Sequence, residues 1–152
     1  MYLGKLLGIN LIMITLLIVA CGNKSNNNVS QTNQNIIQIA YNTYSDWSIS
    51  NVLFGKIIVI NEKFNNEKDL KSLGDTLNYN LKDYKEALVF IFDDANAAKL
   101  QEEMRNKPDL ELDKADEAYY NKHYLGVYNK NSTTGMNEIN IKISGDFSNI
   151  KY

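Results

Sequence analysis

Nine consecutive residues, VLFGKIIVI at positions 52–60, carry the strongest structural signal in the chain. The run is rich in β-branched residues and almost continuously apolar, which is typical of a strand that is buried on both faces of a sheet. A second run of this kind, ALVFIF, follows at positions 87–92. Between the two runs, leucines recur at spacings of three and four residues: Leu70, Leu73, Leu77 and Leu81. This periodicity predicts an amphipathic helix, and strand, helix and strand in this order predict a right-handed crossover between parallel neighbours.

The ends of the predicted helices are marked by residues that cap or stop helices. The helix over residues 67–84 is expected to begin at Asn65 or Asn66, since a side-chain oxygen there can accept a backbone N–H of the first turn. Gly74 inside it either allows a close approach to the sheet or is a tolerated surface glycine. Asp94 is expected to cap a second helix over residues 95–105, and the single proline, Pro108, lies just beyond that helix.

The C-terminal part of the chain predicts a β-hairpin. Residues 124–128 and 136–143 read as its two strands, joined by a polar loop, and in the second strand isoleucines alternate with polar residues. Residues 36–41 are expected to add a short strand at the other end of the domain. We therefore expect residues 36–152 to form a small single α+β domain, a mixed β-sheet with its helices mainly on one face.

The N-terminus has the pattern of a secretory signal. Lys5 gives the start a weak positive charge, and residues 6–20 are mostly apolar. As a helix this segment would span roughly 22 Å, which is shorter than the ~30 Å hydrocarbon core of a bilayer. Residues 1–20 are therefore interpreted as a signal peptide rather than a transmembrane helix.

The four residues Ile18-Val19-Ala20-Cys21, placed directly after the apolar segment, resemble the lipobox of bacterial lipoproteins. In that family the cysteine sulfur receives diacylglycerol and the signal is cut before the cysteine. The resemblance implies cleavage between Ala20 and Cys21, lipidation of Cys21, and anchoring on the extracytoplasmic face of the cell membrane. The alternative is an uncleaved N-terminal anchor with an unmodified Cys21.

Two further blocks, residues 87–100 and 122–141, look similar to parts of uncharacterised small lipoproteins of low-GC Gram-positive bacteria. That group of lipoproteins has no established activity, so the resemblance implies none for this chain.

Residues 21–35, which link Cys21 to the domain, are almost entirely Asn, Gln, Ser and Thr. Such a segment buries too little apolar area to offset the entropy of ordering, so it is expected to be a disordered tether.

Composition argues against several classes of function. Sixteen Lys and Arg against 18 Asp and Glu give a formal charge of −2, without the clustered basic residues that bind nucleic acid. The chain has one cysteine and one histidine, so neither a disulfide nor the usual zinc or triad chemistry is expected. We therefore expect no nucleic-acid partner, no metal, no cofactor and no enzymatic activity.

Aromatic residues provide the candidate binding patch, which consists of Trp47, Tyr119, Tyr120 and Tyr124. Aromatic side chains offer large rigid contact areas and are enriched at interfaces. The alternative is that they belong to an ordinary core. His123 lies among these tyrosines and is either a base or pH-sensing group with a carboxylate partner, or simply a packed or surface histidine.

Two groups of carboxylates are weaker candidates. Asp93 and Asp94 follow a predicted strand, where they either bind a cation or act as acid and base, or end the strand and cap the next helix. A second group is formed by Asp109, Glu111, Asp113, Asp116 and Glu117. An EF-hand counted from Asp109 fails, because Lys114 and Tyr120 occupy the positions that need glycine and glutamate. A looser calcium site or a solvated loop before a short helix over residues 113–121 remain the alternatives.

Three functions are kept open. The leading interpretation is a non-enzymatic, lipid-anchored module that binds an extracytoplasmic protein or peptide, with an immunity-type lipoprotein as a specific form. The alternative is a small carboxylate-dependent enzyme or a calcium-binding envelope domain. The third is a purely structural component of the envelope.

Overall fold

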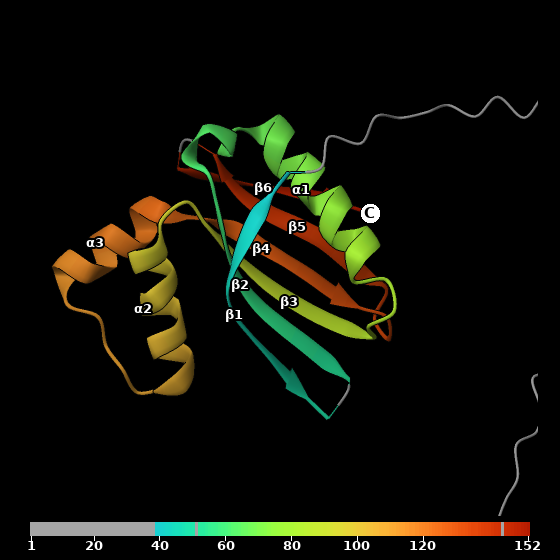
Figure 1. Ribbon diagram of the computed structural model, residues 1–152, viewed down its shortest axis with the longest axis horizontal. Helices are drawn as coiled ribbons and strands as arrows, with labels where there is room; N and C mark the ends of the chain where they lie inside the picture. The colour runs from blue at the N-terminus through green and yellow to red at the C-terminus, as the bar shows by residue number, and fades with distance from the viewer. Residues whose placement is uncertain (1–38, 51, 144) are drawn as a thin grey trace, which may run out of the picture. The chain divides into compact units, whose positions relative to one another are not determined.

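The computed structural model describes residues 39–50, 52–143 and 145–152, which belong to one compact unit, Asn35–Tyr152 (Figure 1). The predicted signal peptide with Ala20, the lipidation site Cys21 and the tether over residues 21–35 lie outside the described residues and stay predictions. Among the helices that are described, none is long and apolar enough to span a bilayer.

The described part of the chain forms one six-stranded mixed sheet with the strand order β1-β2-β3-β4-β5-β6. The strands are β1 Tyr41–Ile49, β2 Leu53–Ile60, β3 Glu86–Phe92, β4 Tyr124–Asn131, β5 Met136–Ile143 and β6 Asp146–Lys151. The helices are α1 Glu67–Asn80, α2 Ala95–Asn106 and α3 Lys114–His123, with a short 3₁₀ helix η1 at Glu62–Phe64. Strands β2 and β3 are parallel and joined through α1, as predicted, and all other neighbours are antiparallel.

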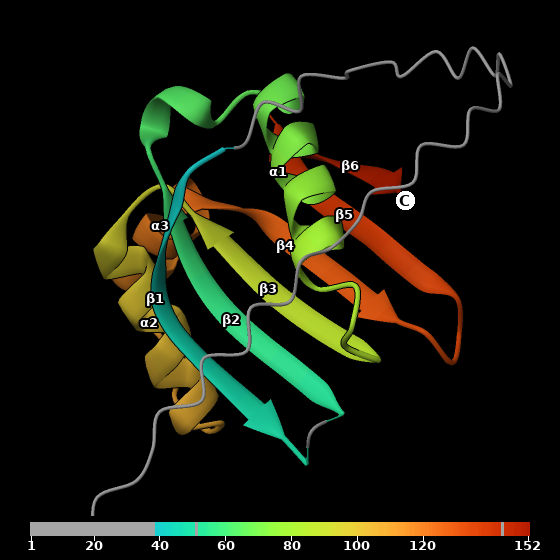
Figure 2. The ribbon, with the colours of Figure 1, turned by 45° about the vertical axis from the view of Figure 1, so that its right-hand side comes forward.

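The helices lie on both faces of the sheet (Figure 2). Ile58 and Ile60 of β2 pack in the cluster that contains the leucines of α1, whereas Ile57 packs in a second cluster with Ala97 and Ala98 of α2. The alternation of side chains along a strand therefore gives β2 a core on each face, as its sequence predicts. The α+β domain with a mixed sheet is confirmed, and α2 and α3 share one face while α1 covers the other.

Each α-helix begins at a residue whose side chain accepts backbone N–H groups of the first turn. Asn66 Oδ1 accepts the Asp69 N–H at 3.1 Å, and Asp94 Oδ1 accepts the Ala97 N–H at 3.1 Å. Asp113 Oδ1 does the same for α3, with 2.9 Å to the Asp116 nitrogen. Each cap of this kind stabilises a helix by about 1 kcal/mol, which explains why these sequence signals were reliable.

The C-terminal residue closes the cluster beneath α1. The Tyr152 hydroxyl donates to the carbonyl oxygen of Lys71 at 3.0 Å, and its ring lies where a side chain on Gly74 would otherwise be. Gly74 is buried, so it is not a surface glycine. The close approach that it permits is to Tyr152 rather than to the sheet itself.

The two edge strands differ from the sequence-based expectation. The first strand was expected over residues 36–41, of which residues 36–38 lie outside the described part; the described strand β1 runs from Tyr41 to Ile49, and β6 was not expected at all. Most residues of both strands are exposed, because an edge strand needs little apolar surface of its own. They form by hydrogen bonding to β2 and β5, which a local sequence pattern does not reveal.

Candidate functional site

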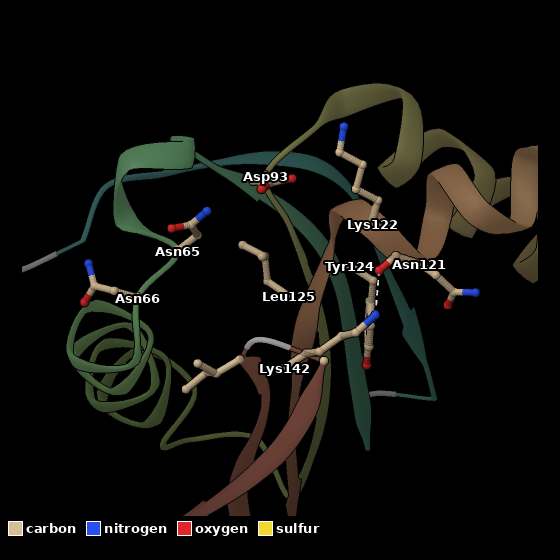
Figure 3. A pocket seen from close by; sticks show the side chains of 10 residues that line it. Asn65, Asn66, Asp93, Asn121, Lys122, Tyr124, Leu125 and Lys142 are labelled. Atoms are coloured by element: carbon tan, nitrogen blue, oxygen red, sulfur yellow. Dashed lines mark hydrogen bonds between the residues drawn. The ribbon is translucent and has the colours of Figure 1, made fainter.

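A cavity of about 590 Å³ opens at the end of the sheet where the parallel strands β2 and β3 finish and α1 begins (Figure 3). Open α/β sheets commonly bind ligands at this position, because the loops that follow parallel strands diverge there. The lining residues are Asn65, Asn66, Asp93, Asn121, Lys122, Tyr124, Leu125, Lys142, Ile143 and Gly145. They come from four stretches of the chain, at residues 65–66, 93, 121–125 and 142–145, so only the folded chain assembles the cavity.

The walls of the cavity are polar and carry charges of both signs. Asp93 contributes a carboxylate, and Lys122 and Lys142 contribute ammonium groups. The Lys142 Nζ donates to the carbonyl oxygen of Asn121 at 2.6 Å, so β5 is tied to the end of α3 at this wall. Amide side chains complete the rim, and Leu125 and Ile143 add apolar surface. Such a lining suits a polar ligand with hydrogen-bonding groups and both charges.

Burial changes the acidity of one side chain in the cavity lining. Tyr124 contributes a phenol, whose pKa burial raises to about 12. At neutral pH this hydroxyl is protonated, so it can donate a hydrogen bond but is a poor nucleophile or base.

Asp93 and His123 form a pair that joins the end of β3 to the end of α3. The distance between His123 Nδ1 and Asp93 Oδ1 is 2.8 Å, and the Asp93 backbone N–H donates to the His123 carbonyl oxygen at 3.3 Å. The histidine thus has a carboxylate partner, Asp93, which lies 30 residues away in sequence. Its ring packs on Tyr119 with 4.6 Å between ring centroids, and it is not among the residues that line the cavity. The pair therefore positions α3 and shapes the cavity wall.

Asp94 acts at the start of α2. Burial favours its protonated form, but hydrogen bonds from the Tyr119 hydroxyl and from the backbone of Ala97 and Asn96 outweigh burial and lower the pKa of the carboxyl. The same contact raises the pKa of the Tyr119 hydroxyl, since its ionisation would place two negative charges together. Both carboxylates after β3 therefore have structural partners, as the capping interpretation of the sequence requires.

The fold brings the predicted aromatic patch together on one face of the sheet. Trp47, Tyr119, Tyr120 and Tyr124 all pack against the cluster of Ile57, Phe92, Ala97 and Ala98. Tyr120 stacks on Tyr124 with 5.7 Å between centroids, and its hydroxyl donates to Gln101 Oε1 at 2.6 Å. The ring of Trp47 lies 4.6 Å from the Arg105 guanidinium.

All four side chains are half-buried, and they pack the sheet against α2 and α3. Burial raises the pKa of the Tyr120 hydroxyl as well as that of Tyr124. Of the four, Tyr124 alone lines the cavity. The arrangement favours a packing role for most of this patch.

The acidic residues before α3 and in its first turn have different structural roles. Asp113 caps α3, and Asp116 and Glu117 lie in its first turn, where they interact favourably with the helix dipole. Within residues 39–50, 52–143 and 145–152, no three carboxylate, histidine or cysteine side chains gather as they would to hold a metal ion. The calcium alternative thus gains no support from the described geometry.

Several cavity residues carried no signal in the sequence. Asp93 was singled out because it directly follows a buried strand, whereas Asn65 and Asn66 come five and six residues after the end of β2 and were noted only as candidate helix caps. Lys122 and Lys142 look like ordinary solvated lysines, and only the pairing of β4 with β5 places Lys142 beside α3.

Comparison with known proteins identifies no relative of this chain. No family model matches the chain, and no significant match is found among curated proteins or among solved structures. The similarity of residues 87–100 and 122–141 to small lipoproteins therefore stays a prediction.

Proposed function

We propose that the protein is a lipid-anchored binding module on the extracytoplasmic face of the cell membrane. The observation that carries the proposal is the sequence Ile18-Val19-Ala20-Cys21 immediately after the apolar residues 6–20. The polar residues 21–35 would then link the lipidated Cys21 to the domain. Two acyl chains anchor a protein stably where a single chain is marginal, so no transmembrane helix is needed.

The cavity at the ends of β2 and β3 supports a binding role for the domain. Its carboxylate, two ammonium groups and amides match a protein or peptide segment that carries polar groups and charges of both signs. We propose this cavity, rather than the half-buried aromatic patch, as the principal contact site. An immunity-type lipoprotein, which intercepts a toxin at the membrane, is one form that such a module can take.

The anchor is tested by replacing its cysteine. In the host, the wild-type chain should incorporate a labelled fatty acid and be found in the membrane fraction in its cleaved form. Cys21→Ala should abolish the label and leave the chain soluble or uncleaved, because it removes the sulfur that accepts the lipid. Asn23→Ala, two residues further on, is the matched control and should behave as wild type. Equal labelling of Cys21→Ala and wild type would contradict the proposal.

The binding site is tested with two charge reversals on one helix. Lys122→Glu changes an exposed residue of the cavity rim, and Lys114→Glu changes an exposed residue at the other end of α3. Partners are cross-linked to the full-length protein in host membranes and quantified by mass spectrometry. Lys122→Glu should reduce recovery of the partner about tenfold, the equivalent of about 1.4 kcal/mol, while Lys114→Glu should leave it unchanged. Undiminished recovery with Lys122→Glu would exclude the cavity as the contact site.

A further inference from the structure

The exposed apolar side chains of the domain are concentrated at the end of the sheet that lies opposite the cavity. Seven large hydrophobic residues are exposed in the described part of the chain. Tyr44 lies within β1 and Phe147 lies in β6. The other five are Ile49, Val52, Tyr79, Tyr84 and Met136. We call these five residues the apolar end.

The strand register places two of these residues, Ile49 and Met136, in one row of the sheet although they are distant in sequence. Ile49 pairs with Leu53, Leu53 with Glu86, Glu86 with Asn131, and Asn131 with Met136, so one row crosses the first five strands at this end. The ends of β1 and β4 and the starts of β2, β3 and β5 therefore lie along one edge of the sheet, as Figure 2 shows.

Val52 lies one residue before Leu53 of this row, and Tyr84 lies two residues before Glu86. The Val52 carbonyl oxygen accepts the Glu86 N–H at 3.1 Å, which fixes the β1–β2 turn beside β3. The ring of Tyr84 lies 4.7 Å from that of Phe54, between centroids. Tyr79 lies in the last turn of α1 and is 66% exposed.

Lysines accompany these apolar side chains. Lys82 Nζ lies 4.9 Å from the centroid of the Tyr79 ring, and Lys85 is exposed next to Tyr84. Lys130 Nζ donates to the carbonyl oxygens of Leu81 and Lys82, each at 2.8 Å. With Lys151 these lysines number four, against three acids at this end, Asp83, Glu86 and Glu138, whereas the whole chain carries a net charge of −2. The apolar end therefore has the opposite charge balance to the protein as a whole.

We propose that the apolar end rests on the surface of an anionic phospholipid bilayer. Ile49 and Val52 enter the acyl boundary, the tyrosines lie at the level of the headgroups, and the ammonium groups of Lys82 and Lys85 meet the phosphates. Aromatic side chains with a polar tip and long lysine side chains are suited to this interface, and an anionic surface attracts nearby lysines.

This inference rests on the proposed function, because the lipid on Cys21 would keep the domain near the bilayer. A small apolar tip binds a membrane weakly alone, but tethering makes the contact intramolecular and so raises its occupancy. The chain is long enough for this orientation. The 20 residues from Cys21 to Tyr41 span at most roughly 70 Å, whereas the nine residues of β1 span about 30 Å.

The test uses single-tryptophan forms of the lipidated full-length protein, since the chain has one tryptophan. The probe carries Trp47→Phe with Ile49→Trp, and the matched control carries Trp47→Phe with Phe147→Trp. Ile49 and Phe147 are similarly exposed, at 59% and 62%. Both proteins are reconstituted into phosphatidylglycerol vesicles, and their fluorescence is compared with and without brominated lipid. The probe should shift to the blue and lose most of its emission to the bromine, while the control should keep its emission.

A second measurement covers the case in which Trp47→Phe disturbs the fold. Hydrogen exchange of the wild-type protein should slow at residues 82–85 and 132–135 on reconstitution into the anionic vesicles. It should slow less in phosphatidylcholine vesicles or at high salt, which screens the lysines.

The outcomes separate this inference from the proposed function. A protein that carries the lipid and sediments with the vesicles, but shows no quenching of the probe and no slowed exchange, overturns the membrane contact and leaves the anchor intact. Slowed exchange at the apolar end only when a protein partner is added would assign that end to a protein interface and also overturn the inference. A chain found without lipid overturns the proposed function and this inference with it.

Discussion

Gly126→Ala should destabilise the domain by at least about 3 kcal/mol. Gly126 lies in β4 with φ of +150°, a conformation that residues with a side chain rarely adopt. A Cβ there would overlap the carbonyl oxygen of Asn140 and lie 3.0 Å from the Cα of Ile141, both in β5. The obstacle is backbone, so it cannot rotate away, and the β4–β5 pairing would have to open locally. Urea unfolding followed by circular dichroism measures the loss.

Gly135→Ala is the matched control for the conformational part of this cost. Gly135 also has a positive φ, +74°, but no heavy atom lies within 4 Å of its Cβ position. This variant should lose only about 1–2 kcal/mol, from the left-handed backbone alone. Equal losses for the two variants would show that overlap with β5 contributes nothing at Gly126.

Gly55→Ala should cost about 2–3 kcal/mol. The ring of Trp47, on the neighbouring strand β1, occupies the position that a side chain at Gly55 would take. The ring has little freedom to move, because the guanidinium of Arg105, a residue of α2, lies 4.6 Å from the ring centroid. A methyl group at position 55 of β2 would therefore push the Trp47 ring outward, and with it β1 and α2. The free energy of unfolding, measured in urea, reports this change.

The physical cause is isolated by a double-mutant cycle with Trp47→Leu. Removing the ring opens the space above Gly55, so in that background Gly55→Ala should cost less than about 1 kcal/mol. The same penalty in both backgrounds would mean that the indole ring is not what keeps position 55 a glycine.

The central elements were predictable because their sequence signals are local. Strand β2 has apolar residues on both faces, α1 has leucines at helical spacing, and Asn66 and Asp94 mark helix starts by bonding N–H groups within three residues. None of these features depends on a distant partner. The parallel β2–β3 pair followed from them, since the crossover through a single helix leaves one common arrangement.

Two residues of the cavity lining, Asp93 and Tyr124, were singled out from the sequence as candidate site residues. The place of Asp93 after β3 is a local feature, but the cavity also needs Lys142 beside the end of α3, and that contact depends on the pairing of β4 with β5. For the aromatic residues, the sequence suggested more exposure than the structure shows. Their abundance suggested a surface patch, whereas the structure packs Trp47 and Tyr120 against α2.

The amino-acid sequence alone was sufficient for the mixed sheet, its parallel centre and the helix caps, because periodicity and capping act over a few residues. The edge strands β1 and β6, the cavity and the apolar end were decided by the tertiary structure. An edge strand takes its hydrogen bonds from a neighbour that can be far away in sequence, and a surface site consists of side chains that only the strand register brings together. Ile49 and Met136 are separated by most of the domain's sequence, yet they end the same row of the sheet.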